Sequence, residues 1–432
     1  MTFWRHLVSL NIALLSLWVS SACAAQQSKL LLAEQPQLDI IKKALSTRHQ
    51  QSPQWQALIS DAEQALAMQP LSVTQSPPLL PGGKPNDYYS VGPYWWPNPR
   101  TADGLPWIKR DGERNHQFRG KDADNEMFFT LSQACFKLGL AYYYTDEKRY
   151  AEKLQQLVEF WFLNSDTAMS AHLNFAQGVP GVASGRPYGI IEFRHLLVIL
   201  DSLTLTKNAT DDDFNQAFNG WLTQFLNWLK TSEIGREQNS KLNNHGTYYD
   251  ALVAGSHLYL NELEQARAVF ENSKKRIIAQ INEQGLQPHE LSRTRPFHYS
   301  AFNLLAFTQL AEMASLADVD LWRYPDKRDA RILKAFDYLL ENADNRALWQ
   351  GKSESEIDTR HMIVPALRIY GHRSGETQSG NKQSSNKQLP LIPNHLINTT
   401  AAQEITMCKL LFSYELNLTK QDVGSGKFAC TL

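Results

Sequence analysis

The chain of 432 residues is long enough for one large domain or two ordinary ones, and 43% hydrophobic and 20% charged residues are typical of a globular protein. A net charge of −1 at pH 7 excludes a polybasic nucleic-acid-binding protein, so an anionic ligand must be met by a local cluster of basic groups. Aromatic residues are numerous, with 11 Trp, 16 Tyr and 19 Phe. Such rings either fill a helical core or form platforms for sugar rings.

The N-terminus has the pattern of a secretory signal peptide. Arg5 precedes an apolar run over 7–19, and small residues on either side of Cys23 then satisfy the cleavage rule. We therefore expect residues 1–25 to be removed and a single domain, residues 26–432, to be exported to the periplasm or secreted. Lipid attachment at Cys23 is the alternative. No later apolar run approaches the about 20 residues that cross a bilayer.

The four cysteines do not make a disulfide scaffold. Cys135 falls in an apolar helical stripe and is expected in the core. Cys408 and Cys430 could pair with each other in an oxidising compartment. No Cys/His spacing typical of a zinc site occurs, and we expect neither a metal nor an organic cofactor.

Helical patterns dominate the chain. Residues 26 to about 75 indicate one or two polar helices, and the Pro- and Gly-rich segment over 77–99 is irregular. From Asp124 onward, apolar residues recur at spacings of three and four, as an amphipathic helix requires. The helices are expected near 124–142, 151–161, 187–206, 214–228, 247–259, 262–281, 297–316, 329–342 and 361–371.

Alternation typical of strands is scarce, and the turn signals between helices are short. This pattern predicts an all-α fold, either an incomplete (α/α)n toroid or barrel built from antiparallel helical hairpins, or an open helical array. The irregular aromatic stretches would line one end of it. A segment rich in Ser, Gln, Asn and Gly, about 374–387, is expected to be a mobile loop.

Polar residues gather at a helix start in the middle of the chain, Asn243-Asn244-His245-Gly246-Thr247-Tyr248. Asn is a favoured N-cap, and a helix start presents unpaired N–H groups that suit an anion. Two other polar stretches interrupt the helices, one over 172–189 and one over 287–300. The cluster is either half of a site or only a helix cap.

The residues of these stretches favour one reaction over another. Glycoside hydrolysis normally needs two facing carboxylates, and Asp250 and Glu290 are available but form no evident pair. β-Elimination on a uronate needs amide and guanidinium groups that neutralise the carboxylate beside C5. A His or Tyr then takes the C5 proton, and a Tyr hydroxyl protonates the departing O4.

Three motifs resemble those of the alginate lyases that fold as α/α toroids. Asn243-Asn244-His245 with Tyr248 is similar to their Asn-Asn-His-Ser-Tyr motif. Asp87-Tyr88-Tyr89-Ser90 leading to Pro93-Tyr94-Trp95-Trp96-Pro97 resembles the N-terminal half of their domain, and Arg293-Thr294-Arg295 with Tyr299 resembles their downstream segment. The resemblance runs from about Pro81 to Tyr370.

The resemblance implies that Asn244 neutralises the carboxylate and that His245 serves as base or positioner. Tyr299 would be the acid, and also the base in a mannuronate-type syn elimination. The family's arginine stands seven positions before the tyrosine, where this chain has Ser292, so we expect Arg293 in its place and Arg295 as the substitute.

Further residues of the same stretches are expected to contact the substrate. Their alternative roles are structural: a strap for the tryptophans, and a core or salt-bridge position for the arginine and histidine. These candidates are Asn243, Tyr248, Arg295, His298, Arg186, Tyr94, Trp95, Trp96, Asn174 and Gln177.

The sequence therefore predicts an exported polysaccharide lyase that cleaves a 1,4-linked uronate polymer by β-elimination, with an anionic polysaccharide as its partner. The alternatives are an α/α-barrel hydrolase using Asp250 or Glu290, and a non-catalytic periplasmic polyuronate-binding protein. Thr247 and Tyr248 depart from the Ser-Tyr part of the family motif, which leaves alginate and glucuronan open. Endo or exo action and the oligomeric state are not predicted.

Overall fold

The computed structural model describes residues 29–33, 35–44, 53–76, 82–118, 120–343 and 345–349, with positions 362, 364, 365, 368 and 369. Several predicted features lie outside these residues: the signal peptide (1–25), the polar loop (374–387), the Cys408–Cys430 pair and most of the helix near 361–371. Within the described part, no helix is both long and apolar enough to span a membrane.

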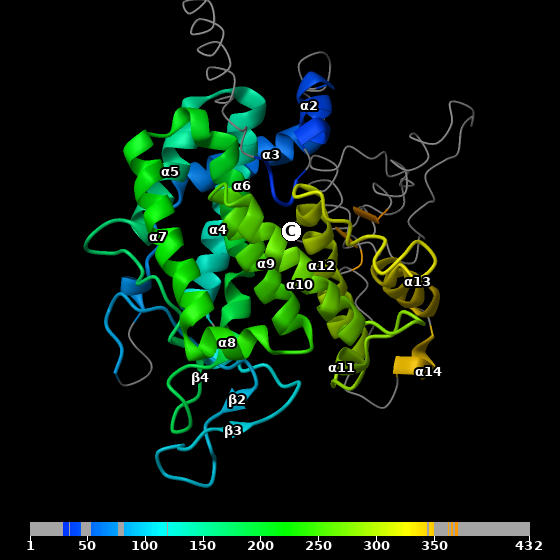
Figure 1. Ribbon diagram of the computed structural model, residues 1–432. Helices are drawn as coiled ribbons and strands as arrows, with labels where there is room; N and C mark the ends of the chain where they lie inside the picture. The colour runs from blue at the N-terminus through cyan, green and yellow to red at the C-terminus, as the bar shows by residue number, and fades with distance from the viewer. Residues whose placement is uncertain are drawn as a thin grey trace, which may run out of the picture.

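Most of the described chain is helical, as the apolar spacing predicted (Figure 1). The α-helices are α2 (Gln35–Ala44), α3 (Pro53–Ala67), α4 (Asp124–Thr145), α5 (Lys148–Phe162), α6 (Leu196–Thr206), α7 (Asp212–Thr231), α8 (Glu233–Asn239), α9 (Asn244–Tyr259), α10 (Leu263–Gln280), α11 (Pro288–Leu291), α12 (Pro296–Ser315), α13 (Arg331–Asn342) and α14 (Arg346–Trp349). Short 3-10 helices are η2 (Val73–Gln75), η3 (His116–Phe118), η4 (Pro187–His195) and η5 (Lys207–Ala209).

Two of the differences from the sequence expectation concern the elements next to α9. The helix expected over 187–206 begins as the 3-10 segment η4 and becomes α-helical only at α6. Helix α8 was not expected, because seven residues are too few to show an apolar period. Helix α8 begins at an N-cap residue, Ser232, whose hydroxyl accepts the Gly235 N–H at 3.0 Å.

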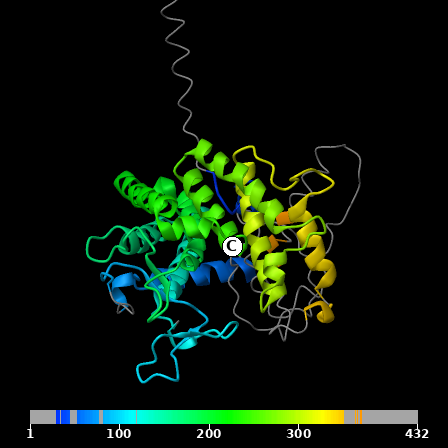
Figure 2. The ribbon, with the colours of Figure 1, turned by 60° about the horizontal axis from the view of Figure 1, so that its bottom comes forward.

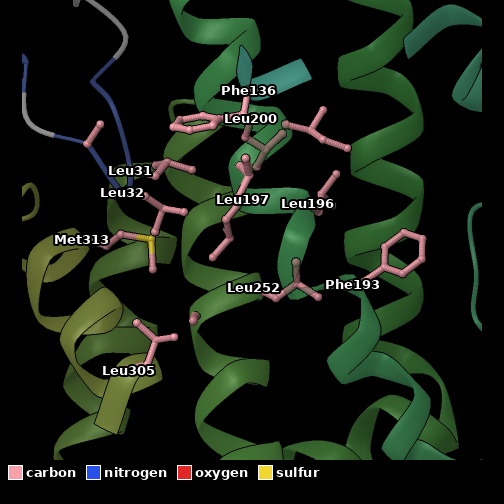
Figure 3. Close-up of a cluster of buried hydrophobic side chains, with 14 of the residues drawn as sticks. Leu31, Leu32, Phe136, Phe193, Leu196, Leu197, Leu200, Leu252, Leu305 and Met313 are labelled. Carbon is pink, nitrogen blue, oxygen red and sulfur yellow. The ribbon is translucent and has the colours of Figure 1, made fainter. Parts of the chain in front are cut away.

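Helix α6 lies in the middle of the hydrophobic core. Its residues 196–203 are all buried, which is typical of a helix that is apolar on every side. Figure 3 shows Leu196, Leu197 and Leu200 among side chains of α4, α9 and α12, such as Phe136 and Leu252. The core therefore holds α9, whose first turn carries the Asn-Asn-His motif, against the rest of the helices.

A buried carboxylate fixes the N-terminal segment to this core. The side chain of Asp201 on α6 accepts the backbone N–H groups of Leu31 at 2.5 Å, Leu32 at 2.9 Å and Ala33 at 3.2 Å. The Leu31 and Leu32 side chains then enter the core (Figure 3). These three hydrogen bonds stabilise the buried carboxylate, and they also give partners to backbone N–H groups that lie outside any helix or strand.

Four short strands shape one end of the molecule. β1 (Tyr89–Val91) pairs in parallel with β4 (Phe175–Gly178), and β2 (Trp95–Trp96) pairs antiparallel with β3 (Ile108–Lys109). The segment with β2 and β3 projects from one end of the helical body in both views (Figure 1, Figure 2). Helix α8 lies at that same end (Figure 1), and both α8 and η4 contact α9. The irregular stretches that carry β1 to β4 thus lie at one end of the helical body, which is where they were expected from the sequence.

Truncating Leu197 to alanine is expected to lower the free energy of unfolding by about 2–5 kcal/mol, because a cavity would open between α6 and Gly255 of α9. The matched control, Ile278→Ala, changes a residue of α10 that is 42% exposed and should cost less than about 0.5 kcal/mol. Urea denaturation followed by circular dichroism measures both. Equal losses would contradict the packing described.

Candidate active site

The start of α9 is held in place by polar groups of its own turn and of α10. Asn243 is the N-cap, and its side chain accepts the His245 N–H at 3.2 Å. The Gln280 amide donates to the Asn243 carbonyl at 3.2 Å and accepts the Thr247 hydroxyl at 3.1 Å. Asn243 therefore acts here as a cap that positions its neighbours.

A buried ion pair fixes the loop before α9. The Arg276 guanidinium donates to both carboxylate oxygens of Asp250, at 2.7 and 2.9 Å, and to the Lys241 carbonyl at 2.7 Å. A Cβ on Gly246 would lie 2.1 Å from both Arg276 and the Lys241 carbonyl, which explains the glycine after the histidine. Asp250 is fully engaged and 3% exposed, so it offers no free carboxylate for hydrolysis.

Glu290 of α11 binds the second asparagine of the motif. Its carboxylate accepts the Asn244 backbone N–H at 2.5 Å and the Asn244 Nδ2 at 2.9 and 3.0 Å. The two N–H bonds of an amide diverge too widely to serve both oxygens of one carboxylate. One N–H therefore points between these oxygens, and among the described residues we find no partner for the other N–H of Asn244, which is 1% exposed.

Burial is the main influence on the pKa values of Glu290 and His245. Desolvation raises the pKa of Glu290 to about 7, against the effect of the Asn244 hydrogen bonds and the Arg293 charge. Desolvation also lowers the pKa of His245 to about 3, and the charges of Arg293, Lys241 and Arg186 act in the same direction. His245 is therefore a neutral imidazole at physiological pH.

Tyr299, near the start of α12, lies between a second phenol and a guanidinium. Its hydroxyl is 2.6 Å from the Tyr94 hydroxyl, and the Arg293 guanidinium lies 4.0 Å from its ring centroid. Burial and Tyr94 raise the pKa of Tyr299 above its ordinary value, whereas Arg293 lowers it. Tyr94 thus contacts the predicted acid directly, and Arg293, rather than Arg295, is the arginine at this tyrosine.

Arg293 connects the two halves of the candidate site. Its charge lowers the pKa values of His245, Glu290 and Tyr299, which come from α9, α11 and α12. Arg295 is the N-cap residue of α12, and among the described residues we find no side-chain contact from it to these groups. Three groups of the candidate site, His245, Glu290 and Tyr299, therefore lie close enough to Arg293 for its charge to act on them.

A second basic group is fixed by the strand β4. Gln177, with its φ of 46° in the left-handed region, accepts Arg186 through its carbonyl at 2.7 Å and its Oε1 at 3.4 Å. The Gln177 amide donates to Glu192 at 3.3 Å, and Glu192 also accepts from Ser90 at 2.6 Å. In this arrangement Gln177 orients Arg186, whose charge acts on His245.

The two tryptophans of β2 lie beneath arginines. The Arg186 guanidinium is 5.4 Å from the Trp95 ring, and the Arg110 guanidinium is 5.2 Å from the Trp96 ring. Both rings are half-buried, and Trp95 also packs on the small cluster of Val91, Trp107 and Val179. The positions of Trp95 and Trp96 are compatible with both expected roles, a structural strap packed on the core and a platform for a sugar ring.

Three other candidates make contacts within the protein. Tyr248 is 2% exposed and donates to the Phe302 carbonyl at 3.2 Å, so its burial gives the expected substrate contact no open face. Asn174 accepts from the Trp228 indole at 2.9 Å. His298 is half-buried, with its ring stacked on Phe302 at 6.3 Å.

The sequence model of the alginate lyase family matches residues 72–349, which is most of the chain. The chain belongs to this family. A crystal structure of an alginate lyase from Bacteroides ovatus is similar over 90% of this chain and 100% of that chain, with a TM-score of 0.76 and 27% identity. No curated protein matches the sequence.

More distant alginate lyases share the fold. Alginate lyase A1-III from Sphingomonas species A1 matches over 82% of this chain and 92% of that chain, with a TM-score of 0.51 and 16% identity. A histidine-to-alanine variant of A1-III complexed with a tetrasaccharide matches over 84% and 94%, with a TM-score of 0.53 and 15% identity. The predicted all-α toroid is thereby confirmed. Family membership makes the protein a polysaccharide lyase that acts on an anionic polysaccharide.

Sequence reasoning assigned no role to three residues that surround His245 in this structure. Gln238 hydrogen-bonds to the imidazole, Tyr188 meets it edge-on with ring centroids 4.9 Å apart, and Lys241 lies 5.1 Å from the Tyr188 ring. Glu290 was considered only as a hydrolase carboxylate. A glutamine in a short polar helix carries no local signal for such a contact.

Replacing Glu290 by glutamine tests the buried carboxyl. In the wild type the folded-state pKa of about 7 exceeds the ordinary value of 4.5, so the folded state holds the proton more tightly. That contribution to stability is complete below pH 4.5 and is lost as the pH rises through about 7. Relative to the variant, the wild type should lose about 3 kcal/mol of unfolding free energy across this range.

Urea denaturation of both proteins at a series of pH values measures this difference. Because glutamine cannot titrate, the variant shows how the stability of the rest of the protein depends on pH. A difference between the two proteins that stays constant with pH would contradict the raised pKa of Glu290.

Proposed function

We propose that the protein cleaves mannuronate-rich alginate by syn β-elimination, with Tyr299 as both base and acid. The observation that carries this proposal is the position of Arg293, which lies on the Tyr299 ring and acts on the charge states of His245 and Glu290. A guanidinium between a helix start and a phenol suits a uronate, which presents its carboxylate next to the carbon that loses a proton.

In the first step Tyr299 takes the C5 proton as a phenolate, the form that the Arg293 charge favours and that burial and Tyr94 disfavour. The electron pair of the C–H bond then enters the uronate carboxyl group as an enolate, which Arg293 and the other N–H of Asn244 stabilise. In the second step this pair forms the C4–C5 double bond while the C4–O4 bond breaks. O4 leaves with its electron pair and takes the proton back from Tyr299. The phenolate is regenerated, and no co-reactant is consumed.

Because Tyr299 acts on both the C5 proton and O4, the mechanism restricts which uronates can be cleaved. A single side chain reaches the C5 proton and O4 only when both lie on the same face of the sugar ring. Mannuronate and glucuronate share this configuration at C4 and C5, whereas guluronate is inverted at C5. The proposal therefore favours mannuronate and disfavours guluronate, and the family match favours alginate over glucuronan.

The positive groups of the site support a polyanionic chain as substrate. Arg186, Lys241 and Arg293 act together on His245, although the whole chain carries a net charge of −1. A local cluster of this kind attracts an anionic polymer without making the protein generally basic. We also propose export, on the basis of the N-terminal apolar run over 7–19 and the small residues that follow it.

Replacing Tyr299 by phenylalanine should lower kcat by about 10²–10⁴-fold with little change in KM, because the proton carrier is lost and the carboxylate contacts remain. The ultraviolet absorbance of the unsaturated product measures the rate. Tyr143→Phe is the matched control: this phenol contacts Asp39 of α2 and should be dispensable for turnover. Activity retained by Tyr299→Phe would exclude the proposed base.

A panel of four polymers tests the substrate: polymannuronate, polyguluronate, mixed alginate and glucuronan. We expect the fastest growth of ultraviolet absorbance with polymannuronate and at least tenfold slower growth with polyguluronate. Equal rates on glucuronan would widen the substrate class to both uronates with this C5 configuration. New reducing ends without absorbance would contradict elimination and indicate hydrolysis.

A further inference from the structure

Gln238 of α8 is buried beneath the motif histidine. It is 0% exposed, and its amide nitrogen lies 3.2 Å from His245 Nδ1 and 3.1 Å from the His245 carbonyl oxygen. One nitrogen with two N–H groups thus meets two atoms of the same residue. Since a primary amide has two donors on its nitrogen, both contacts can be made at once.

The carbonyl oxygen decides which way the Gln238 amide faces. A backbone carbonyl accepts only, so the group opposite it must donate. Turning the amide over would place Oε1 against the His245 carbonyl, and two acceptors would face each other in a buried position. The amide nitrogen therefore faces the histidine, and its second N–H points at Nδ1.

An imidazole nitrogen that accepts a hydrogen bond carries no proton. A neutral histidine has one ring N–H, so the proton of His245 resides on Nε2. Among the described residues none is hydrogen-bonded to Nε2, and the side chain is only half-buried. Nε2–H is thus the edge of the ring that a ligand can reach, and it can donate but not accept.

We propose that Gln238 is a positioning residue that holds His245 in the Nε2–H form, so that the histidine acts in the lyase as a hydrogen-bond donor to the uronate carboxylate and not as a base. This inference rests on the proposed function and sharpens it. His245 joins Asn244 and Arg293 as a third donor for the negative charge, and Tyr299 remains the one proton carrier among these four residues.

The arrangement has a physical advantage for a polyanion site. A protonated histidine among Arg186, Lys241 and Arg293 would add a fourth positive charge to a partly dehydrated cluster. A neutral ring held by Gln238 gives the same directed N–H without that repulsion. The donor is also ready before the substrate arrives, so no reorientation is needed when charge develops.

The test is nitrogen NMR of the wild-type protein with labelled histidine at neutral pH. A His245→Asn variant identifies the signals of His245. We expect Nε2 to have the shift and coupling of a protonated, pyrrole-type nitrogen and Nδ1 those of an unprotonated, pyridine-type nitrogen. The reverse pattern, or a doubly protonated ring, would overturn the proposal. This result does not depend on whether any polymer is cleaved, so it separates the tautomer from the proposed function.

Two variants test the role of Gln238 itself. In Gln238→Glu the carboxylate accepts from the ring, so the proton should move to Nδ1 and kcat should fall roughly 100-fold with little change in KM. Gln238→Met removes the donor without adding charge and should give a mixture of tautomers and a smaller loss. The matched control is Gln224→Glu on the exposed face of α7, which should leave both readouts unchanged.

Circular dichroism of each variant checks that it is folded. If Gln238→Glu is unfolded, Gln238→Met decides alone. A Met variant that keeps the Nε2–H form and full kcat would show that Gln238 does not set the tautomer. A shifted tautomer together with unchanged kcat would show that the N–H donor has no part in turnover.

Discussion

The hydrogen bonds between Glu290 and Asn244 join two parts of the chain that are 46 positions apart. One part is the first turn of α9, which presents Asn244 and His245, and the other is the α11–α12 region with Arg293 and Tyr299. This contact and the packing of α12 against α9 together set the distance between the amide that binds the carboxylate and the phenol that moves the proton. The raised pKa of Glu290 reflects what the contact costs, because a carboxylate is desolvated to make it.

Around this contact, polar side chains replace the hydrophobic core as the packing material. The Asn303 amide donates to Gln280 and to Gln287 at 2.8 Å each, and Gln287 donates to the Ser300 carbonyl at 2.9 Å. These bonds connect the end of α10, the loop before α11 and the first turns of α12. A connected buried network of this kind specifies one arrangement of its helices, because each broken bond leaves a desolvated polar group. These bonds therefore favour one arrangement of α10, α11 and α12 around the site.

Periodicity could predict most of the fold, because spacings of three and four are local features of the sequence. The Asn-Asn-His cap was readable for the same reason. The choice between Arg293 and Arg295 was harder to predict from the sequence. It depends on a non-helical turn in which Arg295 adopts φ −126° and ψ 74°. The contact from Gln238 was not readable at all. It depends on residues brought together by the fold, and a polar glutamine gives no sign of which atom it will face.

The central claim is that Asn244, His245 and Arg293 bind one uronate carboxylate while Tyr299 reaches its C5 proton. A crystal structure of the Tyr299→Phe variant with a mannuronate tetrasaccharide tests it most directly. The account predicts a carboxylate within hydrogen-bond distance of Asn244 Nδ2, His245 Nε2 and the Arg293 guanidinium, with the ring of residue 299 beside C5. A carboxylate bound by Arg295 instead, with the Asn244 amide and His245 Nε2 unoccupied, would contradict it.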